Sequence, residues 1–333
     1  IDSTTLIKTV VQDIYTELAP GITQTEIRYT NAKDSPMHVF LLAVNTSQPG
    51  VFIETGTALN KDSFSFQTIP QMVTATDVPN HKIIAAVNGD FIDEESTQSP
   101  FPTHGVLHKN GVVIKGTFTD TAQKPQQGLS FFGLTQKDTP MIDTRANYAA
   151  VKSSLYNATG GGVILIKDHV VQTQTIPTID PRTGIGFDDN GVVYMVVIDG
   201  RNGQYATGSY GMNYADMAAL FNALGAKSAL NVDGGGSSTY VSRDPGSGTI
   251  ALRNLPSNPG NAPRQLNNCW MVYLSNFLVS NYAGTGSAGL TNGSASSATF
   301  DSPEGCAVDQ NGNVYVADKD NHVIRKISSS GVV

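Results

Sequence analysis

Apolar residues recur at intervals of four along the first eighteen positions of the chain. They are Leu6, Val10, Ile14 and Leu18. This spacing places side chains on one face of a helix, so we predict a helix over Thr5–Leu18. Pro20-Gly21 follows directly and would end it.

A second helical pattern carries signals at both of its ends. Asn213 is a suitable N-cap for a helix over Tyr214–Leu224, with Asp216 three residues further on. Gly225 supplies the left-handed residue that commonly ends a helix. The apolar stripe of this helix, which we expect in the core, comprises Met217, Leu220, Phe221 and Leu224. A shorter helix is predicted over Ile69–Thr76.

Most of the remaining apolar runs have the length of strands. They are Ile22–Tyr29, His38–Val44, Lys82–Val87, Tyr194–Ile198 and Asn267–Leu274. Three hairpins are predicted around Asn110-Gly111, Asn190-Gly191 and Asn311-Gly312, because Asn-Gly favours the positive φ angles of two-residue turns.

The fold class predicted from these elements is α+β, with mixed, largely antiparallel sheets and a few packed helices. The hydrophobic share of 39%, the charged share of 15% and the 33 glycines fit a strand-rich globular chain with many tight turns. Ser280–Ser297 is rich in Gly, Ser, Ala and Asn, which indicates a boundary or a long surface loop. We therefore expect residues 1–80 as part of or beside the main domain, a main domain over 81–276, and a separate segment over 277–333.

The charge of the chain argues against nucleic acid as a partner. The formal net charge is −7, and no cluster of Lys and Arg is present to neutralise phosphates. No apolar run approaches the roughly 20 residues that span a bilayer. Cys269 and Cys306 show neither metal-ligand spacing nor a disulfide framework. With no start Met and abundant small polar residues, we expect a mature or trimmed exported protein, secreted or in the periplasm or cell envelope.

The segment Ala229–Tyr240 carries the most informative chemistry. An apolar run ends in Asp233 and is followed by Gly234-Gly235-Gly236 and then Ser237-Ser238-Thr239. Consecutive glycines suit a place where backbone N–H groups approach an anion closely. A crowded turn between two strands is the alternative.

Four further polar motifs lie at the ends of apolar runs. They are Asn88-Gly89-Asp90, Pro181-Arg182-Thr183-Gly184, Asp199-Gly200-Arg201 and Pro263-Arg264. A rigid scaffold often presents such side chains to a cleft, although Asn-Gly and Asp-Gly also form ordinary turns. Ser237 does not lie in a nucleophile elbow, and no phosphate-loop or dinucleotide fingerprint is present.

Taken in chain order, these motifs resemble the phosphodiester glycosidase family over roughly Lys82–Leu274. The family's first motif usually reads Asn-Gly-Gly-Phe or Asn-Gly-Gly-Tyr, whereas Asp90 stands here in place of the second glycine. The tail, from Pro303 to Ile327, is similar to one NHL repeat. That resemblance implies one β-propeller-type blade, which cannot close a propeller alone.

The resemblance implies hydrolysis of a bond between the anomeric carbon of a sugar and a phosphodiester, without a cofactor or metal. A departing phosphate needs cationic and N–H donors, and the sugar centre needs a carboxylate. Asp233 is the first catalytic candidate and Asp199 the second. The expected substrate-binding residues are Asn88, Asp90, Arg182, Thr183, Arg201, Gly234, Gly235, Gly236, Ser237, Ser238 and Arg264.

Two other functions stay open. The chain could be a non-catalytic carbohydrate-binding or envelope-adhesion protein. It could also hydrolyse phosphodiesters at phosphorus with a metal held by Asp90, Asp93, His104 and Asp199. His104 and His108 lie four residues apart in strand-like sequence, where two polar hairpin residues are the simpler interpretation. The sequence leaves the oligomeric state open.

Overall fold

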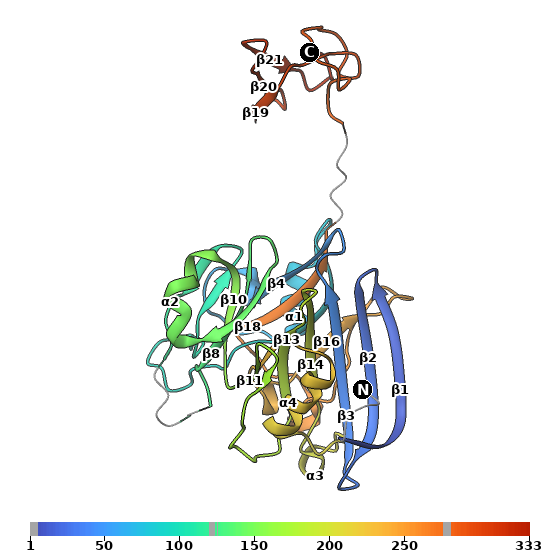
Figure 1. Cartoon of the computed structure of the whole chain (residues 1–333), viewed down its shortest axis with the longest axis vertical. Coiled ribbons are helices and arrows are strands. Elements are labelled where there is room, and N and C mark those ends of the chain that lie inside the picture. The colour runs from blue at the N-terminus through green and yellow to red at the C-terminus, as the bar shows by residue number, and fades with distance from the viewer. Residues whose placement is uncertain (1–5, 120–123, 125, 276–280) are drawn as a thin grey trace. The chain divides into compact units, whose positions relative to one another are not determined.

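The computed structural model describes residues 6–119, 124, 126–275 and 281–333 (Figure 1). The chain divides into two compact units, Ile1–Asn276 and Phe277–Val333. Residues 1–80 lie in the first unit together with the segments that carry the motifs. Among the described residues, no helix is long and apolar enough to cross a bilayer.

The largest sheet of the first unit has eight strands in the order β1-β2-β3-β14-β13-β15-β11-β12, all paired antiparallel. They are β1 (Ile7–Ala19), β2 (Ile22–Asn31), β3 (Pro36–Asn45), β11 (Ile164–Lys167), β12 (Val170–Val171), β13 (Arg182–Phe187), β14 (Val192–Ile198) and β15 (Ser228–Asn231).

Two five-stranded sheets complete this unit, in the orders β7-β6-β10-β8-β9 and β17-β16-β5-β18-β4. The first holds β6 (Leu107–Lys109), β7 (Val112–Lys115), β8 (Ser130–Thr135), β9 (Pro140–Thr144) and β10 (Leu155–Gly161). The second holds β4 (Val51–Thr57), β5 (Lys82–Asn88), β16 (Tyr240–Arg243), β17 (Ile250–Leu252) and β18 (Asn268–Leu274).

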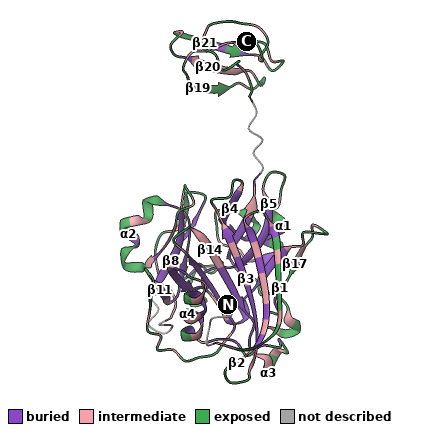
Figure 2. Cartoon of the chain, turned by 45° about the vertical axis from the view of Figure 1, so that its right-hand side comes forward, coloured by how far each residue is buried: buried purple, intermediate pink, exposed green. Residues whose placement is uncertain are grey.

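One apolar core joins the three sheets, with Leu42 from the large sheet, Phe132 from β8 and Trp270 from β18 among its members (Figure 2). Helix α4 (Tyr214–Ala223) packs on strands of the large sheet, and α1 (Ile69–Thr76) packs on β5 and β18. Two further α-helices are single turns, α2 (Tyr148–Val151) and α3 (Asn202–Tyr205). The fold is thus sheet on sheet, with helices on outer faces.

The helix predicted over Thr5–Leu18 is wrong: from Ile7 this segment is strand β1, and Thr5 lies outside the described residues. A spacing of four is a multiple of two, so it also places side chains on one face of a strand. Thr9, Val10, Val11 and Ile14 are β-branched residues, which favour extended backbone. The turn at Pro20-Gly21 then pairs β1 with β2.

The other predicted elements are confirmed. Helix α1 has the predicted bounds, and α4 begins at the Asn213 N-cap, whose side chain accepts the Asp216 N–H at 2.8 Å. Gly225 has a φ of 77° at the predicted stop. The three Asn-Gly hairpins are β6–β7, β13–β14 and β19–β20.

The second unit contains a three-stranded antiparallel sheet. Its strands are β19 (Pro303–Val308), β20 (Val314–Asp318) and β21 (Val323–Ile327). A propeller blade typically has four strands, so the blade stays a prediction. Of the predicted boundary segment, Ser280 lies outside the described residues and the rest forms loops.

Candidate active site

The predicted motifs meet because neighbouring strands run antiparallel. Arg182 at the start of β13 pairs with Ile198 at the end of β14, and Gly184 pairs with Asn231 at the end of β15. The end of one antiparallel strand lies beside the start of the next. The segments around Arg182, Asp199 and Asp233 therefore share one end of the large sheet.

A second sheet brings the first motif to the same place. Asn88 ends β5 and is fully buried; its Nδ2 donates to the carbonyl of Asp233 at 2.7 Å. Its Oδ1 accepts from the Thr183 hydroxyl at 2.7 Å and from the Thr239 N–H at 3.1 Å. The Thr183 hydroxyl also lies 3.3 Å from that of buried Ser238. These residues form a buried polar layer that fixes the backbone on both sides of the glycines.

The glycines border a cavity of about 170 Å³. A hollow of about 110 Å³ adjoins it and shares four of its lining residues, Phe91, Gln127, Asp233 and Arg264. The predicted residues that line the larger cavity are Arg182, Arg201, Asp233, Gly234, Gly235, Gly236 and Arg264. Ser237 lines the smaller one. Asn88, Asp90, Thr183, Asp199 and Ser238 line neither.

Each of the three glycines lies where a Cβ would come too close to a neighbouring group: the Pro181 carbonyl oxygen at Gly234, and a guanidinium group at each of the other two. A Cβ on Gly235, whose φ is 59°, would come within 2.9 Å of Arg201 Nη2. A Cβ on Gly236 would come within 2.7 Å of Arg264 Nη2. The glycine block therefore forms one wall of the cavity, and the guanidinium groups of Arg201 and Arg264 pack against its backbone.

The three arginines differ in how their charges are compensated. Buried Arg182 stacks 4.1 Å from the ring centroid of Tyr214, and its guanidinium donates to the Tyr214 hydroxyl and to two backbone carbonyls. Arg201 forms a bidentate pair with Asp180, at 2.6 and 2.8 Å. Exposed Arg264 has no hydrogen bond or ion pair within the part of the chain that the structure describes. Arg264 is thus the cation most available to an anionic ligand.

Asp233 is the carboxylate that borders both hollows. Its Oδ1 accepts the Gly234 N–H at 2.8 Å. Burial raises its pKa to about 6, although the Ser237 hydroxyl, the Gly234 amide and the charge of Arg264 lower the pKa in part. At neutral pH the group is mainly ionised, yet close enough to its pKa to exchange a proton.

Asp199, the second catalytic candidate, lies apart from the cavity. It is buried, with Oδ1 accepting from Asn254 Nδ2 at 3.0 Å and from the Leu255 N–H at 3.1 Å. Its Oδ2 lies 2.9 Å from Nδ1 of buried His38. These contacts give Asp199 a role in holding the segment around Asn254, so the geometry favours Asp233 as the reacting carboxylate.

The four residues of the metal-dependent alternative do not converge. His104 Nε2 lies 3.9 Å from Asp93 Oδ1, whereas Asp199 bonds to His38 and Asn254. Over the described ranges, no three His, Cys, Asp or Glu residues gather as a metal site.

Several residues of the site escaped sequence reasoning. Asp180 lies directly before the Pro181-Arg182 motif, so adjacency could have suggested it. Phe91 follows Asp90 in the same way. Tyr214 drew notice only as the start of a helix, and nothing in the sequence marks Gln126 or Gln127 as lining residues.

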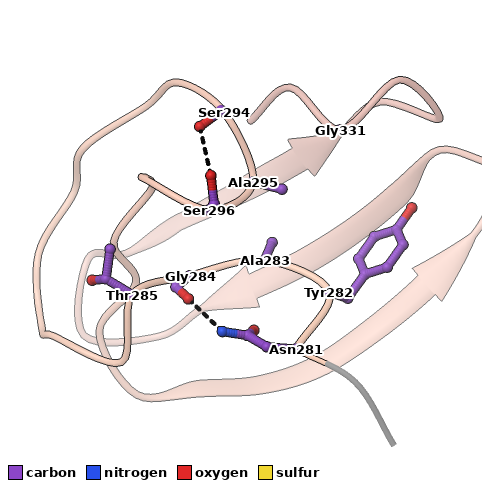
Figure 3. Close-up of a pocket in the computed structure, with 9 residues that line it drawn as sticks. All are labelled: Asn281, Tyr282, Ala283, Gly284, Thr285, Ser294, Ala295, Ser296 and Gly331. Carbon is purple, nitrogen blue, oxygen red and sulfur yellow. Dashed lines mark hydrogen bonds between the residues drawn. The ribbon is translucent and has the colours of Figure 1, made fainter. Parts of the chain in front are cut away.

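A larger hollow than these two lies in the second unit and has different chemistry (Figure 3). It has a volume of about 700 Å³ and is lined by nine residues that include Asn281, Tyr282, Ser294 and Ser296. None of the nine is a carboxylate or a cation. We therefore place the candidate active site at Asp233.

Comparisons with known proteins identify the family of the first unit. Residues 81–273 match the phosphodiester glycosidase family, and residues 300–327 match the NHL repeat. A search of the curated proteins found no match.

Two solved structures share the fold at low sequence identity. One is the zebrafish N-acetylglucosamine-1-phosphodiester alpha-N-acetylglucosaminidase catalytic domain, auto-inhibited by its pro-peptide, with a TM-score of 0.55 and 17% identity. The similarity covers 80% of this chain and 88% of that one. A hypothetical protein from Synechocystis gives a TM-score of 0.55 and 14% identity, over 79% of this chain and 64% of that one.

Proposed function

Because the chain belongs to the phosphodiester glycosidase family, we propose that it hydrolyses the bond between a sugar's anomeric carbon and a phosphodiester. The observation that carries this proposal is the position of Asp233, an ionised carboxylate in a cavity that three guanidinium groups also line. Export to the periplasm, envelope or medium belongs to the same proposal and rests on composition alone.

The cavity suits a leaving group that departs as an anion. When the C–O bond to the anomeric carbon breaks, its electron pair stays on the phosphate oxygen, and the product is a phosphate monoester. Arg264 and Arg201 would stabilise that charge. The N–H groups of Gly234 and Gly235 already donate to Asp233 Oδ1 and to the Pro181 carbonyl. Such a leaving group needs little protonation, so no general acid is required on the phosphate side, and one carboxylate on the sugar side is enough.

Asp233 acts on the sugar side of the bond. As a carboxylate it stabilises the positive charge that develops at the anomeric carbon, and it either attacks that carbon or takes the proton of the attacking water. In the first case water then attacks the anomeric carbon of the resulting glycosyl ester and releases the carboxylate, so in both cases the oxygen of water ends on the sugar. Attack at phosphorus would place it on the phosphate.

The test is hydrolysis in ¹⁸O-water of a panel of sugar-1-phosphodiesters, beginning with an N-acetylglucosamine-1-phosphodiester, with both products identified by mass. We expect ¹⁸O in the released sugar and none in the phosphate. Label in the phosphate, abolished by a chelator, would establish the metal-dependent alternative. Binding of the panel without turnover would establish the carbohydrate-binding alternative.

Arg264→Ala should weaken binding of the phosphodiester, because this exposed guanidinium has no hydrogen bond or ion pair among the described residues and lies against Gly236. A charge-assisted contact of this kind corresponds to a roughly tenfold to hundredfold rise in KM. Lys152→Ala, which removes an exposed cation elsewhere on the same unit, is the control. An unchanged KM for Arg264→Ala would contradict its assignment to the phosphate.

A further inference from the structure

Asp180 is a carboxylate of the cavity wall that the hydrolysis itself does not use. It lines the larger cavity together with Asp233, Arg182, Arg201 and Arg264. Its negative charge offsets part of the positive charge that would attract a phosphate. A cavity that only had to bind phosphate as tightly as possible would gain from the absence of this side chain, so its presence points to a second requirement.

The backbones of Asp180 and Arg201 are both held in place. Asp180 exchanges two backbone hydrogen bonds with Met212, and a Cβ on Gly211 would come within 2.6 Å of the Asp180 carbonyl group. Arg201 has a φ of 60°, in the left-handed region that residues other than glycine rarely adopt, and its N–H donates to the Tyr210 carbonyl at 3.3 Å. Residues held in this region are concentrated at functional sites. The pair is therefore a fixed part of the wall.

Asp180 occupies one side of the Arg201 guanidinium. Its Oδ1 accepts from Nε at 2.6 Å and its Oδ2 accepts from Nη2 at 2.8 Å. This is the two-pronged geometry with which an arginine otherwise grips two phosphate oxygens. Arg201 therefore offers a ligand its charge and its remaining N–H groups, but not this side of the guanidinium.

The charge of Asp180 acts inside the cavity. Burial raises the pKa of Tyr214, which lines the same cavity; the charge of Arg182 opposes this rise, and the charges of Asp233 and Asp180 add to it. Among the described residues that line the cavity, three guanidinium groups and two carboxylates leave one net positive charge. A phosphodiester carries a single negative charge, so its charge matches that of the cavity.

We propose that Asp180 makes this site select phosphodiesters over phosphate monoesters, an inference that rests on the proposed function. A phosphate monoester loses a second proton with a pKa of about 6 and then carries two negative charges. The second charge lies close to the carboxylates of Asp180 and Asp233 and gains no further cation. The phosphate monoester that the hydrolysis releases belongs to this class, so Asp180 also favours the departure of the product.

The first test compares two ligands that contain no sugar and are therefore not substrates. Dimethyl phosphate carries one negative charge, and methyl phosphate carries two at pH 8. Their Kd values are measured by ligand NMR titration of the full native chain and of Asp180→Asn. We expect the variant to lower the ratio of the methyl phosphate Kd to the dimethyl phosphate Kd by about tenfold or more, because it removes a negative charge beside the bound anion.

Asp77→Asn is the matched control. Asp77 pairs with Arg243 at 2.7 Å on the same unit and lines neither hollow of the candidate active site. The variant makes the same chemical change at another Asp–Arg pair, so the ratio of the two Kd values should remain native. Melting temperatures check that both variants are folded.

The sign of the effect separates selection by charge from a structural role. If Asp180 only held Arg201 in position, Asp180→Asn would weaken the binding of both ligands. That result, or an unchanged ratio, overturns the inference. The proposed function survives either result if the native chain binds dimethyl phosphate and Arg264→Ala weakens this binding. Failure of the native chain to bind either ligand would overturn the inference and the assignment of the cavity to phosphate together.

The second test removes the difference in charge between the ligands. At pH 5 methyl phosphate carries one negative charge, as dimethyl phosphate does. Protonation of Asp233, whose pKa is about 6, changes the cavity for both ligands alike. We therefore expect the effect of Asp180→Asn on the ratio to fall from about tenfold at pH 8 to nearly none at pH 5. An effect of the same size at both pH values would assign the selection to the shape of the site and overturn the inference.

Discussion

Asp233→Asn should lower kcat by on the order of 10³-fold or more and leave the melting temperature nearly unchanged. The amide keeps the size of the side chain and an oxygen for the Gly234 N–H, but it can neither stabilise positive charge nor accept a proton. Stability should be preserved because burial already disfavours the charged form of this group. The measurement is turnover of the phosphodiester identified by the ¹⁸O experiment, together with a melting curve.

The pH profile of the native chain adds a second measurement on the same group. With a pKa raised to about 6, Asp233 is protonated below that pH and ionised above it. A nucleophile or base must be ionised, so kcat/KM should fall as the pH decreases through about 6. A profile that rises toward acid would instead assign Asp233 as a general acid.

Asp199→Asn is the matched control and should have the opposite signature. Asp199 Oδ1 accepts from Asn254 Nδ2, and both carboxylate oxygens accept from the Leu255 N–H at 3.1 Å. An amide has one acceptor oxygen in place of two, so in either orientation its NH₂ faces the Leu255 N–H. Leaving a buried donor unpaired costs about 1–3 kcal/mol. We expect a lower melting temperature with kcat retained in the folded fraction. Native turnover in Asp233→Asn combined with lost turnover in Asp199→Asn would reverse the two assignments.

Sequence reasoning identified elements whose ends carry chemical signals. Helix α4 was predictable from its Asn213 cap and its Gly225 stop, and the hairpins from their Asn-Gly turns. Strand β1 was not, because a spacing of four fits a helix and a strand equally. The segment is a strand because it pairs with β2, and the local pattern of apolar residues does not reveal such a contact with another segment.

The motifs predicted segments that the structure brings together at the candidate site, but not which of their side chains face the cavity. Asn88 and Asp233 both end strands, yet Asn88 turns inward to tie three segments together and Asp233 faces the cavity. Which way each side chain points depends on how two sheets meet. Periodicity along one strand does not show how two sheets meet. For the same reason, the pairing of Asp180 with Arg201 could be recognised only in the structure.

Asp90, which stands where the family's motif has a glycine, lies in a buried space beside Gly105 and Gly160. It is 2% exposed, and its Oδ2 accepts the Gly105 N–H at 2.6 Å. A Cβ on Gly160 would collide with this carboxyl group, and one on Gly105 would lie 3.0 Å from Oδ2. Two glycines on neighbouring segments thus make the room that the aspartate occupies. The aspartate holds the start of the Phe91 segment and does not face the cavity.

This burial makes the stability of the first unit depend on pH. Burial raises the pKa of Asp90 to about 7, and the charge of Asp233 adds to the rise, while the Gly105 and Phe91 amides and the charge of Lys115 oppose it. In the unfolded chain an aspartate has a pKa of about 3.9. Between these two pH values the folded form binds one proton more than the unfolded form. The stabilisation that the protonated Asp90 side chain gives the folded state is therefore complete below pH 4 and is lost as the pH rises through 7.

Asp90→Asn should therefore remove most of that slope, because an amide is neutral at every pH. Three pKa units correspond to about 4 kcal/mol, so the variant should match the native chain near pH 4 and exceed its free energy of unfolding by up to about 4 kcal/mol at pH 8. Trp270 is the single tryptophan and is fully buried in the first unit, so its fluorescence during urea unfolding reports on this unit. Asp62→Asn makes the same change at an exposed aspartate. If the free energy of unfolding of Asp90→Asn differs from that of the native chain by the same amount at every pH from 4 to 8, Asp90 does not titrate in this range. Its carboxyl group would then be held by the Gly105 N–H and Lys115 in one charge state.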